Sequence, residues 1–460
     1  MIRIVYMCGY HSKTDLYGRR SEIKTFTHIS SVIPEIFQKL VNYQLYILPK
    51  RVFDLSKPFL LRISTSECSM PEGAPVSVVS FSHLGYDSDQ ISEVTYNTVK
   101  KLADDGLLRA LYVLDTEPTV SLDEWMIETP IPGGKTLPRI IYLLDQLAPI
   151  DGFDPRQVIS EIFDRIVASN IGGGQIVHLF PEFQHTAERA KREELTTVVY
   201  ARGCHPEETL RLYEEEQSRF DADIEVPYDW FHRYQRTYDH ADHVFYLCDY
   251  VRETFIERGF SEDCLFKVGP LTVDPNVYRP SRSKSTEFTV LAVSNMTPLK
   301  GTRYLLDAWD LIDIDEAQLV LCGGISDDVQ AELGPRIEQD ASINHLGHVD
   351  DIAEQYRQAS VFVHPSLTEG FGKVYPEAMA SEVPVIATEN GPTEFIDDAG
   401  FIVPIRDPKA IAEKLRYLHD NPDEAQHMGE RGRTIVEANS WEGFSQRVFD
   451  GHKTILKNLQ

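Results

Sequence analysis

The amino-acid sequence predicts an α/β protein with two doubly wound parallel sheets, and two observations support this prediction. The chain has 460 residues, which exceeds what one hydrophobic core usually supports, so two domains are expected. Short β-branched runs alternate with helical stretches, clearly in the C-terminal half and more loosely in the N-terminal half. Apolar strands separated by helices form a parallel sheet covered on both faces, and right-handed crossovers make such a sheet doubly wound.

The C-terminal half shows the alternation most clearly. Its expected strands are each followed by an expected helix: 288–293 by 304–312, 318–322 by 328–337, and 361–364 by 376–381. Two further strands, 383–388 and 401–404, precede a helix that begins near Pro408. The stretch from Trp441 is also helical in pattern, and we expect it to pack back on the first domain.

The N-terminal half repeats the pattern less regularly. Its expected strands are 2–7, 43–48, 76–80, 110–114, 175–180, 196–200 and 243–247. The rhythm breaks between residues 50 and 130, which predicts an insertion there. Residues 279–287 are polar and lack periodicity, as a linker does. The predicted domains are therefore 1–285 and 286–440, with 441–460 as the returning helix.

The charge balance restricts the classes of partner. The chain has 72 Asp and Glu against 45 Lys and Arg, a net charge of −27. Such a surface repels phosphates, so binding of nucleic acid or of anionic membranes through bulk charge is not expected. A soluble, self-repelling surface explains the excess, and so does adaptation to a salty cytoplasm, where repulsion is screened. Composition leaves both explanations open.

Cysteine usage and hydropathy indicate the compartment. The six cysteines form no Cys-x-x-Cys pair, which is typical of free thiols in a reducing compartment. The apolar run at the N-terminus is too short for a signal sequence, and no apolar stretch approaches the roughly 18 residues that span a bilayer. We therefore expect a cytoplasmic protein without stable membrane insertion.

A glycine-containing segment after the expected strand 361–364 is the strongest candidate site. Open parallel sheets bind ligands at the carboxyl ends of their strands. Gly370 and Gly372 let the backbone approach a ligand closely, and free N–H groups at the start of the next helix attract phosphate or hydroxyl oxygens. Glu369 and Glu377 can each accept hydrogen bonds from sugar diols. The plain alternative is a solvated Glu369 and a Glu377 that stabilises the helix dipole.

The run Pro-Ser-Leu-Thr-Glu-Gly-Phe-Gly-Lys-Val-Tyr-Pro-Glu-Ala-Met-Ala at 365–380 resembles the E-x7-E signature of glycosyltransferase family 4. Members of that family have the GT-B architecture, in which two Rossmann-like domains face a central cleft. Further segments resemble the family in the same order: 299–301, 321–324, 345–350, 383–387 and 391–394. The resemblance is close over roughly residues 240–445.

The resemblance implies roles for the residues of the second domain. Glu369 would contact the donor sugar, and Glu377 the ribose diol. The backbone of Gly370, Phe371 and Gly372 would line the sugar. Lys300, on a loop bounded by Gly301, would neutralise the donor diphosphate, although it could also be a solvated surface lysine.

One position departs from the family pattern. The family usually has an arginine five positions before this lysine, where this sequence has Asn295. An amide can hydrogen-bond a phosphate but cannot offset its charge. The donor is then either held differently or contacted by another cation, and Arg202 is the candidate for that role.

The first domain resembles the family more faintly. Tyr17-Gly-Arg-Arg20 resembles the glycine loop that lets donor phosphate approach the first helix, with Gly18 as the close-approach residue; a simple helix-entry turn is the alternative. His178 is expected near the reacting sugar. His205, in Arg-Gly-Cys-His after the next strand, is expected near the donor. Each histidine could instead be a hydrogen-bonded structural residue at a strand end.

Together these features predict a retaining glycosyltransferase that uses a nucleotide sugar as co-substrate. The acceptor, which could be a glycan, a lipid-linked sugar or a small molecule, is not indicated, and a lipid-linked acceptor would imply transient membrane association. Three Asp-x-Asp triplets match the roughly three expected by chance in so acidic a chain, so no metal is predicted. The alternatives are a non-catalytic two-domain sugar-binding protein and a GT-B phosphorylase or epimerase.

Overall fold

The computed structural model describes residues 74–80, 83–84, 90–116, 127–129, 154–221, 223–281 and 287–460. All of them belong to one unit, Cys68–Gln460, which contains two parallel sheets. Two expected strands, 2–7 and 43–48, and the expected glycine loop at Gly18 lie outside the described residues.

The first sheet has seven described strands in the order β5-β3-β1-β6-β7-β8-β9, and all of its strand pairs are parallel. The strands are β1 (Val76–Val79), β3 (Leu108–Tyr112), β5 (Ile127–Glu128), β6 (Ile176–Leu179), β7 (Thr196–Tyr200), β8 (His243–Tyr246) and β9 (Leu265–Lys267). The described chain runs from β1 to β3 on one side and returns at β6 on the other. The order therefore reverses between β1 and β6, which is the switch point where such sheets bind ligands. Outside this sheet, β2 (His83–Leu84) pairs with β4 (Asp115–Thr116).

The expected insertion at 50–130 needs a correction. β1 and β3 fall inside that range, yet they are neighbouring strands of the first sheet. The four residues of β1 are Val-Ser-Val-Val, and all are buried. Their β-branched side chains suit a strand covered on both faces, so this part of the range belongs to the domain's own fold.

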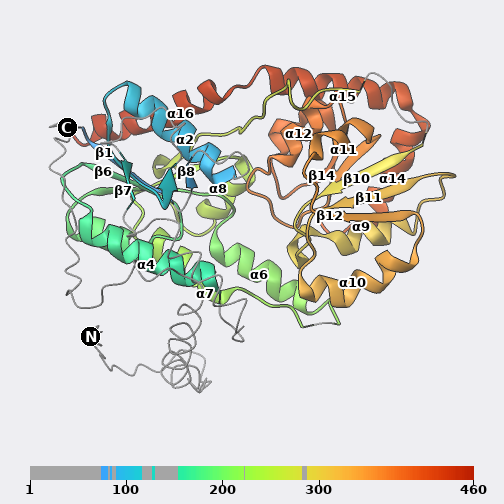
Figure 1. Cartoon of the computed structure of the whole chain (residues 1–460), viewed down its shortest axis with the longest axis horizontal. Helices are drawn as coiled ribbons and strands as arrows, with labels where there is room; N and C mark the ends of the chain where they lie inside the picture. Colours follow the sequence, from blue (N-terminus) through green and yellow to red (C-terminus); the bar gives the residue numbers. More distant parts are fainter. Residues whose placement is uncertain are drawn as a thin grey trace, which may run out of the picture. The chain divides into compact units, whose positions relative to one another are not determined.

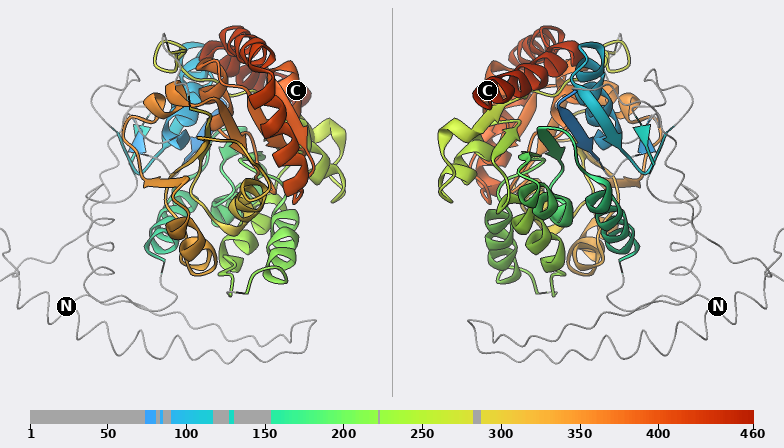
Figure 2. Two further views of the ribbon diagram at one scale, coloured as in Figure 1. Left: turned by 90° about the vertical axis from the view of Figure 1, so that its right-hand side faces the viewer. Right: turned by 90° about the vertical axis from the view of Figure 1, so that its left-hand side faces the viewer.

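Helices cover both faces of the first sheet (Figure 1). α2 (Gln90–Asp104) and α16 (Trp441–Asn458) pack against each other on one face, and the turned views in Figure 2 show them on the same side. α4 (Pro155–Asn170), α5 (Gln184–Arg192) and α7 (Tyr228–Tyr238) lie on the other face. Ser440 caps α16 by accepting a hydrogen bond from the N–H of Gly443 at 3.0 Å, as N-cap serines do. The C-terminal helix thus packs on the first sheet.

Two helices follow strands of the first sheet toward the second domain. α6 (Pro206–Gln217) comes after β7, and α8 (Asp249–Ile256) comes after β8. His205 caps α6, and Pro206 occupies its first turn, where a missing N–H costs nothing.

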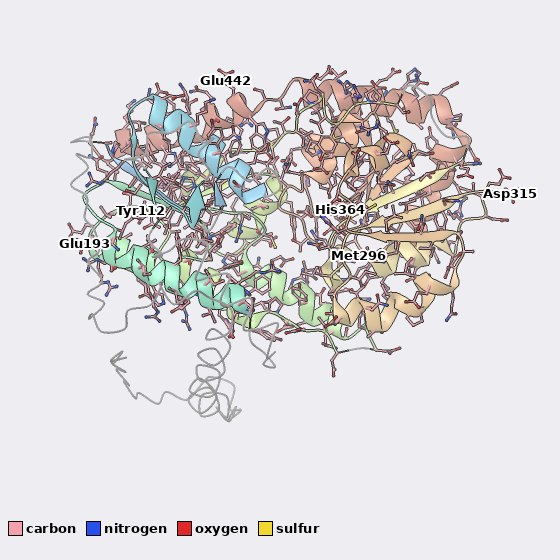
Figure 3. The ribbon with its side chains drawn as sticks, in the orientation of Figure 1. Tyr112, Glu193, Met296, Asp315, His364 and Glu442 are labelled. Atoms are coloured by element: carbon pink, nitrogen blue, oxygen red, sulfur yellow. The ribbon has the colours of Figure 1, made fainter. Side chains whose placement is uncertain are left out.

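The second sheet has six described strands in the order β12-β11-β10-β13-β14-β15, again all parallel. The strands are β10 (Thr289–Val293), β11 (Gln318–Cys322), β12 (Ile343–Gly347), β13 (Val361–His364), β14 (Val385–Thr388) and β15 (Gly400–Val403). The order reverses between β10 and β13. Figure 3 shows Met296 and His364 near the same end of these strands, while Asp315 lies at the opposite end.

Two buried apolar layers sandwich the second sheet. α9 (Thr302–Trp309), α10 (Asp327–Gln339) and α14 (Pro408–Asp420) contribute to one layer. α11 (Ile352–Gln358), α12 (Val374–Ala380) and α15 (Pro422–Glu437) contribute to the other. α13 (Thr393–Ile396) follows β14. The prediction of a doubly wound α/β fold with two Rossmann-like domains is confirmed. Among the described helices, none is both long and apolar enough to span a bilayer.

Candidate functional site between the two sheets

Two loops meet at the switch point of the second sheet. One follows β10 and ends in the short 3-10 helix η3 (Pro298–Lys300); the other follows β13 and leads to α12. The N–H of Leu367 donates to the carbonyl of Leu299 at 2.8 Å. Gly301 has φ +68°, and a Cβ on it would lie 2.0 Å from the carbonyl oxygen of Pro365. The glycine therefore allows both the left-handed turn and the close contact that join the loops.

The joined loops bring three polar side chains together. The Lys300 ammonium donates to Oε2 of Glu369 at 2.7 Å, and Nε2 of His364 lies 3.0 Å from the same oxygen. Burial disfavours the charged carboxylate, but the positive charge of Lys300 and the hydrogen bond from His364 outweigh it and hold the pKa of Glu369 well below its usual range. Burial lowers the pKa of His364, so the neutral ring donates its Nε2–H to Glu369. Glu369 is therefore a partly buried anion beside a cation.

The loop that carries Glu369 is pressed against the first domain. A Cβ on Gly370 would lie 1.8 Å from the carbonyl oxygen of Arg202, so no other residue fits without moving backbone. The thiol of Cys248 donates to the Gly370 carbonyl at 2.8 Å, and the hydroxyl of Thr368 donates to the sulfur of Cys204 at 3.1 Å. These contacts of residues 368–370 with Arg202, Cys204 and Cys248, here called the seam, fix Glu369 against the strand ends of the first sheet.

A cavity of about 330 Å³ lies beside this seam. From the first domain it is lined at the carboxyl ends of three neighbouring strands by Phe180, Tyr200 and Leu247, which belong to or follow β6, β7 and β8. The remaining lining residues are Val94, Arg202, Leu271, Glu369, Phe371 and Gly372. The described walls of the cavity thus combine apolar side chains with the Arg202 cation and the partly buried Glu369 carboxylate, as small-molecule sites do.

Arg202, which the sequence suggested as another cation for the donor, is part of the cavity wall. It lines the cavity together with Glu369, and its guanidinium donates to Oε2 of Glu182 at 2.8 Å. The guanidinium also lies over the rings of Phe180 and Tyr234. These contacts orient the planar guanidinium from several sides, which favours a fixed position at the cavity.

Glu377 occupies a different position from Glu369. It is buried in α12, and its two oxygens accept hydrogen bonds from the hydroxyls of Tyr278 (3.1 Å) and Tyr356 (3.0 Å). Burial raises the pKa of Glu377 even though Lys373 and the tyrosine hydroxyls oppose this effect. Both carboxylate oxygens thus already have protein partners, so a ribose diol would have to share or replace them.

Asn295 is exposed in the loop after β10. The N–H of the next residue, Met296, donates to the carbonyl of Gly324 at 2.7 Å, and a Cβ on Gly324 would lie 3.7 Å from Oδ1 of Asn295. The amide therefore lies beside the glycine turn that follows β11, another strand-end loop of the second sheet.

The prediction that His178 lies near the reacting sugar needs a correction. The ring is fully buried on the α16 face of the first sheet, where it stacks on His452 with its Nδ1 3.1 Å from the partner Nε2. His452 donates through Nδ1 to the carbonyl of Val448 at 2.8 Å, so His178 donates to His452. Burial lowers the pKa of both rings. His178 is absent from the cavity wall, whereas Phe180, two residues further along, is part of it.

His205 also has a structural role. Its Nδ1 accepts the N–H of Glu207 at 3.3 Å and so caps α6. Its ring packs among Tyr238, Phe255 and Phe260, and burial lowers its pKa to about 4. The expectation of a donor contact is not met, because the side chain turns into the core of the first domain.

The first-domain glycine loop was predicted from the resemblance of Tyr17-Gly-Arg-Arg20 to the family. In the described sheet, β1 (Val76–Val79) lies at the switch point, and the first glycine that follows it in the sequence is Gly85. Neither Gly18 nor Gly85 belongs to the described residues. The described part of the chain holds no group of three His, Cys, Asp or Glu residues that could bind a metal ion, and the Asp87/Asp89 triplet lies outside it.

The two facing sheets with a site at their strand ends have the GT-B architecture. Residues 287–421 match the sequence model for glycosyl transferases group 1. Over 173 residues the chain is 30% identical to O-antigen chain mannosyltransferase B of Escherichia coli, covering 36% of this chain and 45% of that one. Over 251 residues it is 28% identical to a GDP-mannose-dependent phosphatidylinositol monomannoside mannosyltransferase of Mycobacterium tuberculosis, covering 47% and 63%. The aligned part therefore spans less than two thirds of these relatives.

Solved structures share the fold at low sequence identity. Sucrose-phosphate synthase from Thermosynechococcus elongatus superposes with a TM-score of 0.60 and 19% identity, covering 84% of this chain and 99% of that one. HepE from Anabaena in complex with UDP-glucose superposes with a TM-score of 0.57 and 15% identity, covering 83% and 99%. These neighbours support the two-domain fold.

Proposed function

We propose that the protein is a retaining glycosyltransferase of family 4 that transfers a sugar from a nucleotide-sugar donor. The observation that carries the proposal is the partly buried Glu369 carboxylate, which pairs with Lys300 at the switch point of the second sheet and lines the cavity together with Arg202. The match of residues 287–421 to group 1 glycosyl transferases supports it, as do the curated relatives, which are named as glycosyltransferases.

The chemistry of sugar transfer fits these residues. Positive charge develops on the anomeric carbon while negative charge develops on the departing diphosphate, so the site must supply fixed cations and donors to the leaving group. In this proposal Lys300 and Arg202 offset the diphosphate charge, and Asn295 adds an amide where the family usually has an arginine. Glu369 accepts hydrogen bonds from sugar hydroxyls while Lys300 turns to the phosphate.

The proposal includes retention of the stereochemical configuration at the anomeric carbon. Among the described residues of the cavity wall, Glu369 is the sole carboxylate, and Lys300 and His364 already hold it. A carboxylate held in this way suits sugar binding better than nucleophilic attack. We therefore infer front-face attack by the acceptor hydroxyl, assisted by the departing phosphate.

The donor is expected to carry UDP or GDP. HepE is described in complex with UDP-glucose, and the mycobacterial relative is described as GDP-mannose-dependent. The acceptor is expected to be a hydroxyl compound that reaches the cavity from the first domain, whose Phe180 and Tyr200 are part of the cavity wall. Lipid-linked sugars are candidates, and they would bring the enzyme transiently to a membrane.

A thermal-shift screen with UDP, GDP and ADP tests the proposal. One nucleotide at a hundred times its dissociation constant is expected to stabilise the folded protein by about 2.7 kcal/mol. The Lys300→Gln variant should lose most of this shift, because it keeps a polar side chain but removes the charge that faces the diphosphate. A protein whose unfolding temperature does not respond to any of these nucleotides would contradict the proposal.

His178→Ala is expected to affect stability rather than turnover. The substitution removes a buried ring and leaves Nε2 of His452 without its donor, which should cost about 2–4 kcal/mol of unfolding free energy. At a temperature where both proteins are folded, kcat should stay within about threefold of the wild type. Chemical denaturation measures the first effect and initial rates measure the second. A large loss of kcat would show that His178 acts at the reacting centre.

A further inference from the structure

The helix that follows the Arg202 loop is built into the second domain. α6 starts at Pro206 beside the strand ends of the first sheet, and its far half enters the apolar layer of the second domain. Leu212 is fully buried there, in the same cluster as Leu299 and Leu305. α6 also contacts η3, the turn that carries Lys300. One helix therefore connects the loop of one proposed cation with the loop of the other.

The end of α6 is held by a buried carboxylate. Glu216 has no exposed surface, and its two oxygens accept hydrogen bonds from the hydroxyl of Tyr304 at 3.0 and 2.9 Å. Nε of Arg406 donates to Oε1 of Glu216 at 2.7 Å, and its Nη1 lies 2.9 Å from Glu215. A charge buried in this way is costly unless it is fully partnered, so both partners in the second domain are needed to keep α6 in place.

Two further observations show that the contact is specific. Arg406 has φ +60°, a left-handed conformation that is unfavourable for a side chain of this size and persists only where the surroundings impose it. Beyond α6, the N–H of Asp221 donates to Glu332 at 3.1 Å, and Arg303 bonds to the Arg219 carbonyl and to the same Glu332. The attachment therefore continues past the end of the helix.

We propose that α6 and residues 218–221, here called the strut, set the position of Arg202 relative to Lys300. Glu216, Tyr304 and Arg406 are positioning residues in this proposal, since they hold the strut and do not line the cavity. The proposal rests on the proposed function for its consequence, the binding of a diphosphate between two cations. Its structural part, the mechanical coupling of the two loops, can be tested without any ligand.

The test compares two variants of the second domain. Tyr304→Phe removes the hydroxyl that donates to Glu216. Ser342→Ala is the matched control. It removes the hydroxyl that accepts a hydrogen bond from Nε1 of Trp309 at 2.9 Å. Trp309 lies on α9, as Tyr304 does, but this contact does not involve α6. Hydrogen exchange followed by mass spectrometry, on the full chain without nucleotide, reads the backbone amides of 203–205 and 212–217.

Tyr304→Phe is expected to speed exchange about tenfold in both segments, whereas Ser342→Ala leaves both unchanged. Faster exchange at 212–217 with unchanged exchange at 203–205 would overturn the strut, because the helix end would then loosen without moving the Arg202 loop. Unchanged exchange in both segments would overturn it as well.

Titration calorimetry with UDP and GDP measures how the strut affects the binding of nucleotide at the proposed site. The dissociation constant of the nucleotide that binds should rise at least about fivefold in Tyr304→Phe and in Glu216→Gln, and stay at the wild-type value in Ser342→Ala. Equal affinities in all variants would overturn the positioning role. If the wild type binds neither nucleotide, the proposed function fails, and the exchange data still decide whether the strut couples the two loops.

Discussion

Replacing Glu369 by alanine is expected to abolish sugar transfer while the protein stays folded. The carboxylate is the proposed contact to the donor sugar, and it orients Lys300 and His364 through hydrogen bonds of 2.7 and 3.0 Å. Its loss removes a group that binds the sugar and leaves the Lys300 charge without a partner. We expect kcat/KM to fall by about 10³-fold, the size seen when a fixed polar group of a transition state is removed.

Glu369→Gln separates charge from shape. The amide keeps the size of the side chain but presents one acceptor oxygen instead of two and pairs poorly with both Lys300 and a sugar diol, so activity should also fall strongly. Glu394→Ala is the matched control, because Glu394 also bridges the domains, through Lys267 at 2.9 Å, without lining the cavity. Initial rates with the preferred donor and circular dichroism give the answer. Near-normal turnover in Glu369→Gln would show that the site lies elsewhere.

The elements of the second domain were predictable because its strands are short apolar runs between helices. Two of them, Gln318–Cys322 and Val361–His364, lie where the sequence placed them. The strand Ile343–Gly347 was missed as a strand, since it lies at the edge of the sheet and its three central side chains are exposed. An edge strand of this kind lacks the continuous apolar pattern that reveals a buried one.

The meeting of the candidate site residues was predictable in the second domain and only in part in the first. Glu369 and Lys300 both follow strands next to a switch point, so their meeting follows from topology. The positions of the two histidine side chains were predicted wrongly, because a polar residue at a strand end can point to either face of the sheet. His178 points toward α16, and the helix that covers it comes from the far end of the chain. Periodicity within one strand carries no information about that partner.

The cavity residues that were not predicted from the sequence occupy equivalent positions in the first sheet. Phe180, Tyr200 and Leu247 stand at the carboxyl ends of three adjacent strands, where apolar side chains look like ordinary core. Aligning the ends of the predicted strands could have found them. The contact between Gly370 and Arg202 has no such signal, since it joins segments more than 160 positions apart and depends on how the two domains meet.

Gly370→Ala is expected to lower the free energy of unfolding strongly, because it adds a methyl group where the two domains are in contact. The added Cβ would lie 1.8 Å from the carbonyl oxygen of Arg202 and 2.7 Å from its carbon. Both are backbone atoms, so the clash is relieved only if the Glu369 loop and the Arg202 loop move apart. Overpacking of this severity should cost about 3 kcal/mol or more. The same displacement would separate Glu369 from Arg202 and lower sugar transfer steeply.

Gly203→Ala is the matched control on the opposite side of the same seam. A Cβ on Gly203 would meet nothing within 4 Å, and its backbone is not in the left-handed region, so the unfolding temperature should stay close to that of the wild type. Differential scanning calorimetry and donor-dependent rates compare the two alanine variants. If Gly370→Ala were as stable and as active as Gly203→Ala, the loops could not be in contact as described, and Glu369 and Arg202 would not form one site. A less stable Gly370→Ala whose loss of activity exceeds its loss of folded protein would show that the close approach of the loops serves the chemistry as well as the fold.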